Sequence, residues 1–537
     1  MNTAPSAGTT GFIYHLVSGA SAVKQFVARH ASKITGVLQG FDRTLFRGHL
    51  SRLCYPDGVA SFLRGQGVLL KKFGGFVQSM TDLLRDAGVS LAKNLGRPVQ
   101  YLQSSRTSKE EVALGHLRRQ PVKEGLVCLL TCVEPCWSWQ VFRSRKDQTQ
   151  ELRRRTGKCL HQYFYLIDPD FGWMHVRVQT WMPYTVQVYV NGREWLAQQL
   201  DRAGLGYRRA DNCFLALDDV GRTQQIMDRM LALRWPRLLD RAVTTVNPVL
   251  DLIAQHAKGG YHWCLHQCEI ATDIMFRRPD DLASLYPGLV RHAISQFGSG
   301  DVMRFLGKPL VASYRGEVVT NYKRRLEGIS IRHRAGGNSI KMYDKAGSIL
   351  RVETTTNDPG QFKRRRRAQG RPDSECKPRP LRKGTADMRL RAEVSAQANA
   401  RYLQALAAVD HDRKLQDLLA AVLVRAEIGG RKVRPLAPWS HPDLDLLRAI
   451  GRGEFIANGF RNRDLLPLLC HDAASDPHTR RRASACITRL LRLLRAHRLI
   501  RKIEHTHRYQ LTQRGRQLVT AVLTASEASI NKLKQCA

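Results

Sequence analysis

The stretch from Arg461 to Leu518 constrains the fold most, because its apolar residues change period within a short length of chain. Asn462 can cap a short helix over residues 463–469, and a polar turn at 471–478 precedes a longer helix that ends at Ala496. Four apolar residues of the longer helix follow the i, i+3, i+4, i+7 spacing of one buried face: Ile487, Leu490, Leu491 and Leu494. The opposite face carries Arg482, Ala485, Arg489 and Arg492. A basic face with one small residue suits close approach to a DNA groove.

Two short extended segments follow this helix, over residues 499–504 and 507–512, with a tight turn at His505 and Thr506 between them. A further helix begins near Gln513. The segment LLRLLRAHRLIRKIEHTHRYQLTQRGRQLV resembles the winged helix of MarR-type and ArsR-type DNA-binding proteins. In those proteins the helix before the hairpin enters the major groove, and the hairpin touches the backbone or the minor groove. The resemblance therefore implies contacts to duplex DNA from that helix and from Arg508.

Winged helices also serve as protein-protein modules, and the charge of this region decides between the two roles. From Gly451 to Ala537 there are 17 Lys and Arg against 6 Asp and Glu. Phosphate contacts require such an excess of cationic side chains, whereas packing against another protein does not. We therefore expect this region to bind nucleic acid.

The composition of the whole chain agrees with a polyanionic partner. With 86 Lys and Arg against 46 Asp and Glu, the formal net charge is +40, far more than solubility requires. The 12 cysteines form no compact disulfide framework, and no secretory leader is recognisable, which favours a reducing cytoplasm. No apolar run is long enough to cross a bilayer, so no membrane role is expected.

The order of apolar, glycine-rich and charged segments predicts an α+β multidomain chain with a mixed α/β body and a C-terminal winged helix-turn-helix. Asp168 to Gly172 is a strong turn signal, which makes residues 160–167 and 173–181 an expected antiparallel hairpin. The expected segments are a polar N-terminal segment (1–33), a first α/β region (34–193), a helical region (194–306), a second β region (307–362), a basic linker (363–385), a helical connector (386–445) and a winged-helix domain (446–537).

The second β region contains the wording SIKMYDK followed by ILRVETT. This alternation places Lys341, Tyr343 and Lys345 on one face of a strand, and Arg351 and Glu353 on one face of the next. The arrangement resembles a strand pair of replication initiators of plasmids and filamentous phages, which cut single-stranded DNA with a tyrosine and a metal held by a His-hydrophobic-His motif. No such histidine pair is recognised in this chain. A platform that binds a nucleic-acid backbone or stacks on bases is the favoured interpretation.

A run of four arginines, Arg364, Arg365, Arg366 and Arg367, lies in the expected basic linker. Like charges in such a run repel one another in a compact element, so we expect them to contact a nucleic-acid strand.

Three carboxylates could carry chemistry. Asp42 follows a glycine near the end of an expected strand, Glu134 ends the apolar run from Leu126 to Val133, and Glu269 or Asp273 is a third candidate. Carboxylates at neighbouring strand ends can bind Mg²⁺ or Mn²⁺ for phosphodiester chemistry, with Asp42 and Glu134 as the metal ligands. The alternative is that Asp42 pairs with Arg43 or Arg47 and that Glu134 caps a turn. A structural zinc site among the histidines and cysteines of residues 262–268 is a weaker expectation, because their spacing matches no paired zinc motif.

Together these patterns predict a nucleic-acid-binding protein of mobile-element type, either a transposase-like or a replication-initiator-like enzyme. Two alternatives stay open: a non-enzymatic winged-helix transcriptional regulator, and an RNA-binding partner of a mobile element. The expected partners are duplex DNA at the winged helix and RNA or single-stranded DNA at the body. Homo-oligomerisation is left open.

Overall fold

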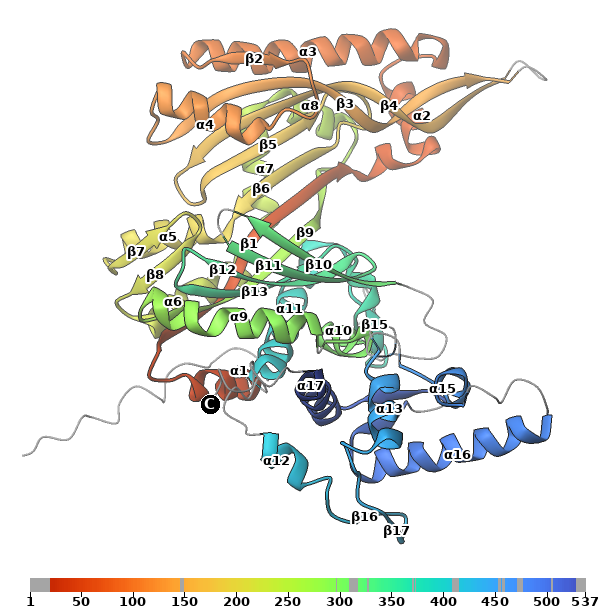
Figure 1. The fold of residues 1–537 in the computed structure, drawn as a ribbon. Coiled ribbons are helices and arrows are strands. Elements are labelled where there is room, and N and C mark those ends of the chain that lie inside the picture. Colours follow the sequence, from red (N-terminus) through yellow and green to blue (C-terminus); the bar gives the residue numbers. More distant parts are fainter. Residues whose placement is uncertain are drawn as a thin grey trace, which may run out of the picture. The chain divides into compact units, whose positions relative to one another are not determined.

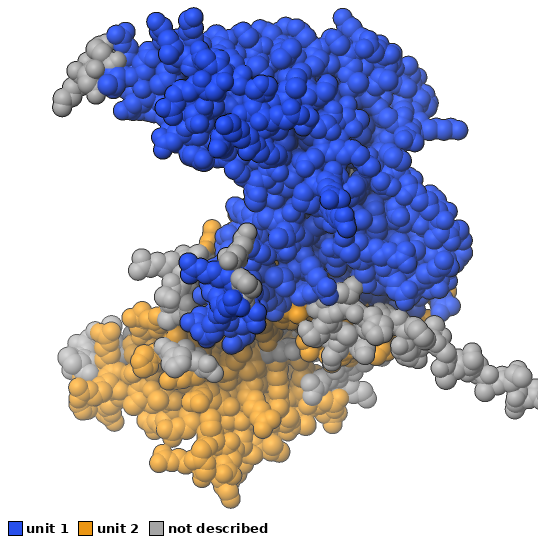
Figure 2. Space-filling model, turned by 180° about the vertical axis from the view of Figure 1, so that it is seen from behind, with its two compact units in different colours: residues 1–18, 34–277, 348–396 blue, residues 19–33, 278–347, 397–537 orange. Residues whose placement is uncertain are grey.

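The computed structural model describes most of the chain, namely residues 20–144, 149–295, 297–308, 317–325, 328–368, 371, 373–407, 415–452, 455, 459–470, 477–503 and 506–527. Much of the expected N-terminal segment (1–19), and parts of the two expected C-terminal turns (471–476 and 504–505), lie outside the described residues. The chain divides into two compact units (Figure 2): residues 1–18, 34–277 and 348–396 form unit 1, and residues 19–33, 278–347 and 397–537 form unit 2. Both combine helices with strands, so a mixed α and β fold is confirmed.

Unit 1 is built on a large sheet (Figure 1). Its strands are β1 (Ile34–Leu50), β2 (Val99–Leu102), β3 (Gly125–Arg143), β4 (Gln150–Asp168), β5 (Gly172–Gln179), β6 (Val186–Asn191), β9 (Tyr261–Phe276) and β13 (Ile349–Thr356). Their order is β13-β9-β1-β6-β5-β4-β3-β2. All neighbours are antiparallel except β2 and β3, which run parallel because the helix α4 (Lys109–Arg119) connects them.

Helices cover one face of this sheet and bury its valines. Val176 and Val178 of β5 and Val186, Val188 and Val190 of β6 alternate with partly exposed residues, as a strand with one buried face requires. They belong to the same core as apolar side chains of α3 (Phe73–Asn94), α7 (Trp235–Val246) and α8 (Val249–His256). Each buried valine stabilises the unit by about 1.5–3 kcal/mol. The other elements are α2 (Pro56–Gly65), α5 (Gly192–Arg202), α6 (Val220–Arg229), β7 (Tyr207–Ala210), β8 (Cys213–Leu217), β14 (Lys363–Arg366), β15 (Lys377–Pro380) and the first part of α11 (Met388–Ala407).

The hairpin predicted around the turn at Asp168 is confirmed. Strands β4 and β5 pair up to Asp168 opposite Gly172, and the Asp168 carboxylate accepts hydrogen bonds from the backbone of Asp170 and Phe171 at 2.8 and 3.0 Å. Asn191 ends β6, and its side chain accepts from Arg193 N at 2.9 Å to begin α5.

Three other expectations about elements need correction. Residues 34–50 are one 17-residue strand rather than a pair, because Gly40 stays paired with Ala271 of β9 and the chain passes Asp42 without turning. The region expected to be helical, 194–306, also contains β7, β8 and the long strand β9, whose pairing with β1 and β13 overrides its local pattern. The expected linker includes the hairpin of β14 and β15, which is held by Arg366 donating to the buried Asp387 at 2.9 Å.

Unit 2 contains α1 (Ala20–Arg29), α9 (Pro279–Ser295), α10 (Ser299–Phe305) and the antiparallel strands β10 (Val318–Arg325), β11 (Gly328–Ala335) and β12 (Asn338–Lys345). His333 of β11 is fully buried and its Nε2 lies 3.1 Å from the hydroxyl of Tyr402. Arg516 and Asp301 form an ion pair at 2.6 Å, which joins the C-terminal helix to α10.

The C-terminal part of unit 2 has its own apolar core. Its elements are α12 (Leu415–Ala420), β16 (Ala426–Ile428), β17 (Arg431–Val433), α13 (His441–Ile450), α15 (Asn462–Leu469), α16 (Pro477–Ala496), β18 (Ile500–Lys502), β19 (Tyr509–Leu511) and α17 (Gln513–Glu527). Ile487, Leu491 and Leu494 of α16 are buried in this core, as predicted. Asn462 does not cap α15; the Asp464 carboxylate accepts from Arg461 N, and the Asn462 amide instead donates to Ser484 O at 2.8 Å.

Candidate functional site

An irregularity in the pairing of β1 with β9 positions the first candidate residue. Phe41 pairs with Ile270 and Thr44 pairs with Cys268, so Asp42 and Arg43 together oppose the single residue Glu269. This is a β-bulge, which changes the direction of the side chains around it. As a result Asp42 is buried while Arg43 is exposed.

The bulge brings three buried carboxylates together, and we call Asp42, Glu269 and Glu353 the carboxylate cluster. One carboxylate oxygen of each lies within 4.8 Å of the others, and the three residues are 1%, 7% and 3% exposed. Glu353 reaches this position because β13 pairs with β9 with Glu353 opposite Ala271 and Thr355 opposite Glu269. Residues two apart on a strand share a face, so Glu269 and Glu353 are diagonal neighbours.

A buried arginine neutralises one edge of the cluster. The Arg351 guanidinium donates to Asp42 Oδ2 at 2.9 Å and to both carboxylate oxygens of Asp273 at 2.5 and 2.8 Å. Arg193 adds a second ion pair to Asp273 at 3.0 Å. The Asn212 amide donates to Asp42 Oδ1 at 2.6 Å. Asp42 and Asp273 are therefore matched by two guanidinium groups.

Glu269 holds its proton more tightly than an ordinary glutamate, because it is buried beside two other carboxylates. Burial, then the neighbouring Glu353 and Asp42, raise its pKa to about 7, although Gln267 donates a hydrogen bond to it at 2.6 Å. A carboxylate that is buried beside two others requires a proton or a cation. The oxygen donors of this cluster are those that Mg²⁺ and Mn²⁺ prefer, so these residues could hold such an ion.

Glu134, expected to share a metal with Asp42, lies elsewhere in unit 1. It is on β3, and three strands, β6, β5 and β4, separate β3 from β1. Its carboxylate accepts from Lys109 at 2.7 Å, from Arg177 at 2.9 Å and from the Tyr163 hydroxyl at 2.6 Å. Burial opposes ionisation, but these three donors outweigh it and lower its pKa to about 2. Both Asp42 and Glu134 also lie within long strands rather than at strand ends.

The structure gives Arg351 a different role from the expected nucleic-acid contact. Its side chain is fully buried and bound to Asp42 and Asp273, so it positions the carboxylate cluster. Glu353 was not among the expected ligands. The alternation that placed Arg351 and Glu353 on one strand face carried the relevant signal, because a buried arginine beside a buried glutamate is typical of a polar site.

Basic and aromatic side chains continue from the cluster across the same face of the sheet. Tyr189 of β6 pairs with Leu45 of β1 and with His175 of β5, and its ring stacks on the His175 ring with centroids 5.1 Å apart. Burial and then Arg177 lower the pKa of His175 to about 4. Arg43, Tyr189, His175 and Arg177 are all partly or fully exposed. This face therefore offers cationic and stacking groups beside the carboxylates.

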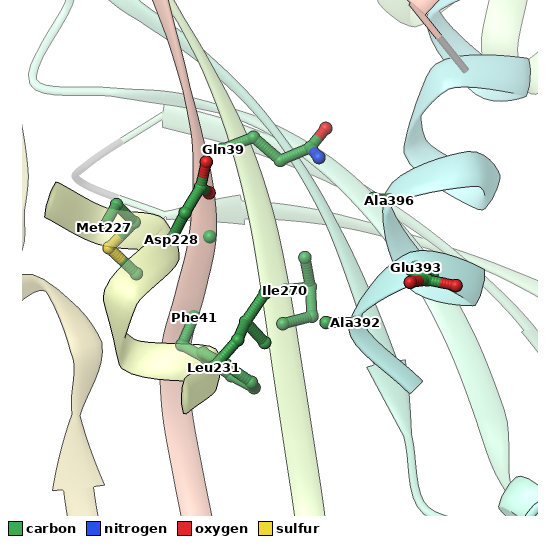
Figure 3. A pocket seen from close by; sticks show the side chains of 10 residues that line it. Gln39, Phe41, Met227, Asp228, Leu231, Ile270, Ala392, Glu393 and Ala396 are labelled. Atoms are coloured by element: carbon green, nitrogen blue, oxygen red, sulfur yellow. The ribbon is translucent and has the colours of Figure 1, made fainter. Parts of the chain in front are cut away.

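A small pocket lies between α6, strands β1 and β9, and α11 (Figure 3). The Gln224 side chain bonds the backbone N–H and C=O of Gln39 at 2.9 and 2.8 Å. Burial raises the pKa of Asp228, which lines the pocket, to about 6. None of the three cluster residues lines this mostly apolar pocket, and it does not belong to the candidate site.

The expected nucleic-acid contacts are accessible in several places. On α16, Arg482, Ala485, Arg489 and Arg492 are exposed, and Arg508 is partly exposed. On β12, Lys341, Tyr343 and Lys345 are partly exposed, and Lys341 Nζ lies 3.8 Å from the centroid of the Tyr343 ring. Lys363 and Arg365 of β14 are exposed, whereas Arg364 and Arg366 are partly buried; Arg367 follows this strand and is exposed.

Comparison with protein-family models, with curated proteins and with solved structures found no match. Among the described residues, every helix is too short or too polar to span a membrane.

Proposed function

We propose that this chain is a nucleic-acid enzyme that cuts or joins phosphodiester bonds at the carboxylate cluster with Mg²⁺ or Mn²⁺, in the manner of a replication initiator or a transposase. The observation that carries the proposal is the burial of Asp42, Glu269 and Glu353 within 4.8 Å of one another. Burying three carboxylates side by side is costly unless a cation compensates them. Burial and the neighbouring Glu353 and Asp42 raise the pKa of Glu269 to about 7, as expected where carboxylates repel one another, and a divalent cation would relieve this repulsion.

Each of these residues would contribute differently. Glu269 and Glu353 supply oxygen ligands, and Arg351 holds Asp42 in a fixed orientation. A divalent cation would stabilise the charge that develops on the phosphate in the transition state. Arg43, beside the cluster and exposed, would bind the phosphate backbone, and the Tyr189 ring offers a stacking surface for a base.

The test uses the full-length protein with labelled single-stranded DNA, duplex DNA and RNA in MgCl₂ or MnCl₂. Products with defined ends are expected for one of these substrates. Glu353→Gln and Glu269→Gln should lower the cleavage rate by about 100-fold or more while binding persists, because a metal acts chiefly on the transition state. Asp228→Asn is the matched control, since Asp228 is a carboxylate with a raised pKa outside the cluster. Cleavage by both glutamine variants at the parent rate, or no cleavage by the parent, would overturn the proposal.

A second candidate function is that of a winged-helix regulator that binds duplex DNA without cutting it. The observation that favours it is the order α15, α16, β18, β19 and α17, with its own apolar core and an exposed basic face on α16. This order resembles that of a winged helix, in which α16 would be the recognition helix. Sequence-specific duplex binding with no cleavage of any substrate would favour this function over the enzymatic one.

A further inference from the structure

Strands β1 and β9 bring two histidines and a cysteine together, away from the carboxylate cluster. His49 pairs directly with His262, and their ring centroids are 5.2 Å apart. Cys264 is two residues from His262 on β9 and therefore shares its face. One ligand atom of each of the three lies within 4.8 Å of the other two. We call His49, His262 and Cys264 the His-His-Cys cluster.

The three donors are those of a transition-metal site. Imidazole nitrogen and thiolate sulfur are the usual ligands of zinc in proteins, and catalytic zinc sites have three protein ligands with a fourth position open. Zinc-ligand distances of about 2.0–2.3 Å put tetrahedral ligands roughly 3.5 Å apart, so a shift of about 1 Å closes the site. His262 is exposed and the other two are partly exposed, so their side chains have room to adjust.

The charged side chains around the cluster are cationic, which favours an anion in the open fourth position of a metal site. A neutral imidazole is the form in which His49 and His262 can bind a metal. Three cationic side chains, Lys383, Arg391 and Arg47, lie near the Cys264 thiol. Metal binding replaces the thiol proton, which leaves to solvent; the Zn²⁺ ion and one thiolate then leave a net charge of +1, which an anionic fourth ligand would balance.

We propose that His49, His262 and Cys264 bind one Zn²⁺ ion that ties β1 to β9, with the fourth position open to water or to an anionic ligand. The nitrogen and sulfur donors distinguish this site from the carboxylate cluster, whose oxygen donors suit Mg²⁺ or Mn²⁺. The zinc site therefore does not depend on the proposed phosphodiester chemistry.

Cobalt substitution tests the proposal in the full-length protein. Metal-stripped protein is titrated with Co²⁺, and Zn²⁺ is then added as a competitor. A thiolate-to-cobalt charge-transfer band that saturates at one equivalent is expected, together with the intense visible bands of tetrahedral Co²⁺ and their loss as Zn²⁺ displaces the cobalt. Cys264→Ser should abolish the charge-transfer band. His49→Ala and His262→Ala should weaken binding at least about tenfold.

Matched controls separate this site from other metal binding. Cys376→Ser and His256→Ala change an exposed cysteine and an exposed histidine outside the cluster and should leave the titration unchanged. Glu353→Gln should leave the thiolate-to-cobalt band unchanged, because oxygen ligands give no such band, so failure of the phosphodiester proposal does not affect this readout. His262 is exposed, so His262→Ala tests the site even where Cys264→Ser does not fold. No charge-transfer band in the parent, a band retained in folded Cys264→Ser, or unchanged affinity in both alanine variants would overturn the zinc site.

Discussion

Arg351 provides a buried positive charge next to the carboxylate cluster of unit 1. Its guanidinium donates hydrogen bonds to two buried carboxylates, Asp42 and Asp273, of which Asp273 also pairs with Arg193. A buried ion pair contributes little against an apolar alternative, but the loss of one partner leaves an uncompensated charge. Arg351 is therefore a structural requirement for the carboxylate cluster.

We predict that Arg351→Met lowers the free energy of unfolding by about 3–5 kcal/mol, because Asp42 and Asp273 lose their shared cation. Urea denaturation followed by circular dichroism measures the change. Arg85→Met is the control, since Arg85 forms exposed ion pairs with Asp82 and Asp86 and should change stability by at most about 1 kcal/mol. Adding Asp273→Asn to Arg351→Met should recover part of the loss. Equal stability of the two arginine variants would contradict this role.

Glu269 makes the stability of the protein depend on pH near neutrality. Its pKa is about 7 in the folded chain, above the ordinary value of 4.5 that it has when unfolded. The contribution of protonated Glu269 to the free energy of unfolding is therefore complete below pH 4.5 and is lost as the pH rises through 7. Between these two pH values, the protein loses about 1.4 kcal/mol of stability for each pH unit.

Glu269→Gln stays neutral and should escape this loss. We expect it to melt several degrees above the parent at pH 8 without divalent cations and close to the parent at pH 4.5. Mg²⁺ should raise the melting temperature of the parent at pH 8 but not that of the variant, because a cation stabilises the ionised cluster. Glu427→Gln is the control, since Glu427 is exposed on the short strand β16, and it should melt like the parent at both pH values. A variant that gains no stability at pH 8 would show that Glu269 is not held in a crowded anionic setting.

Among the helices and strands, the sequence predicted those features that depend on contacts between residues close together in the chain. The β4-β5 hairpin was predicted because the turn at Asp168 bonds its own backbone. The buried and exposed faces of α16 followed from a helical period of 3.6 residues. Strand β9 was missed, since its ladder with β1 and β13 joins distant parts of the chain, as in the 78-residue separation of Asp273 and Arg351.

In the candidate site, too, local sequence features were predicted and features that depend on long-range strand pairing were not. Asp42 and Glu269 were recognised as chemically suitable, but their partner Glu353 depends on the position of β13 beside β9. The expected partner Glu134 was inferred from a strand order that placed two apolar segments side by side. Residue type alone therefore predicted the kind of chemistry but not the set of ligands, which the bulge at Asp42 and the strand order determine.

For α16 we predict that the double variant Arg489→Ala/Arg492→Ala weakens duplex DNA binding. The loss should be about 1–3 kcal/mol for each arginine that reaches a base edge. For an arginine that contacts only phosphate, the salt slope should fall by about one. Fluorescence anisotropy at several salt concentrations measures both effects. Arg495→Ala, exposed on the same helix but outside the stripe of Arg482, Ala485, Arg489 and Arg492, should bind like the parent. Equal affinity of parent and double variant, with the fold intact, would exclude α16 as a DNA-reading helix.

The whole molecule carries a formal net charge of +40, and its described surface has exposed cationic side chains in both units. Binding to a polyanion releases condensed counterions, so affinity should fall steeply with salt. The carboxylate cluster is buried within this basic molecule, and the exposed Arg43 follows Asp42 directly in the sequence.

We predict that the affinity of the full-length protein for its preferred nucleic acid falls by about 10³–10⁵ between 50 and 200 mM salt, as for proteins with several phosphate contacts. Anisotropy titrations on single-stranded DNA, duplex DNA and RNA measure the slope for each. The Arg43→Ala variant should reduce the salt dependence of affinity for a nucleic acid that binds unit 1. The Arg489→Ala/Arg492→Ala variant should reduce the salt dependence of affinity for duplex DNA that binds α16. Because the two changes lie in different units, their effects on a substrate that engages both should add, since distant and independent contacts are additive. A shallow slope on all three nucleic acids would mean that the positive charge serves a different polyanion.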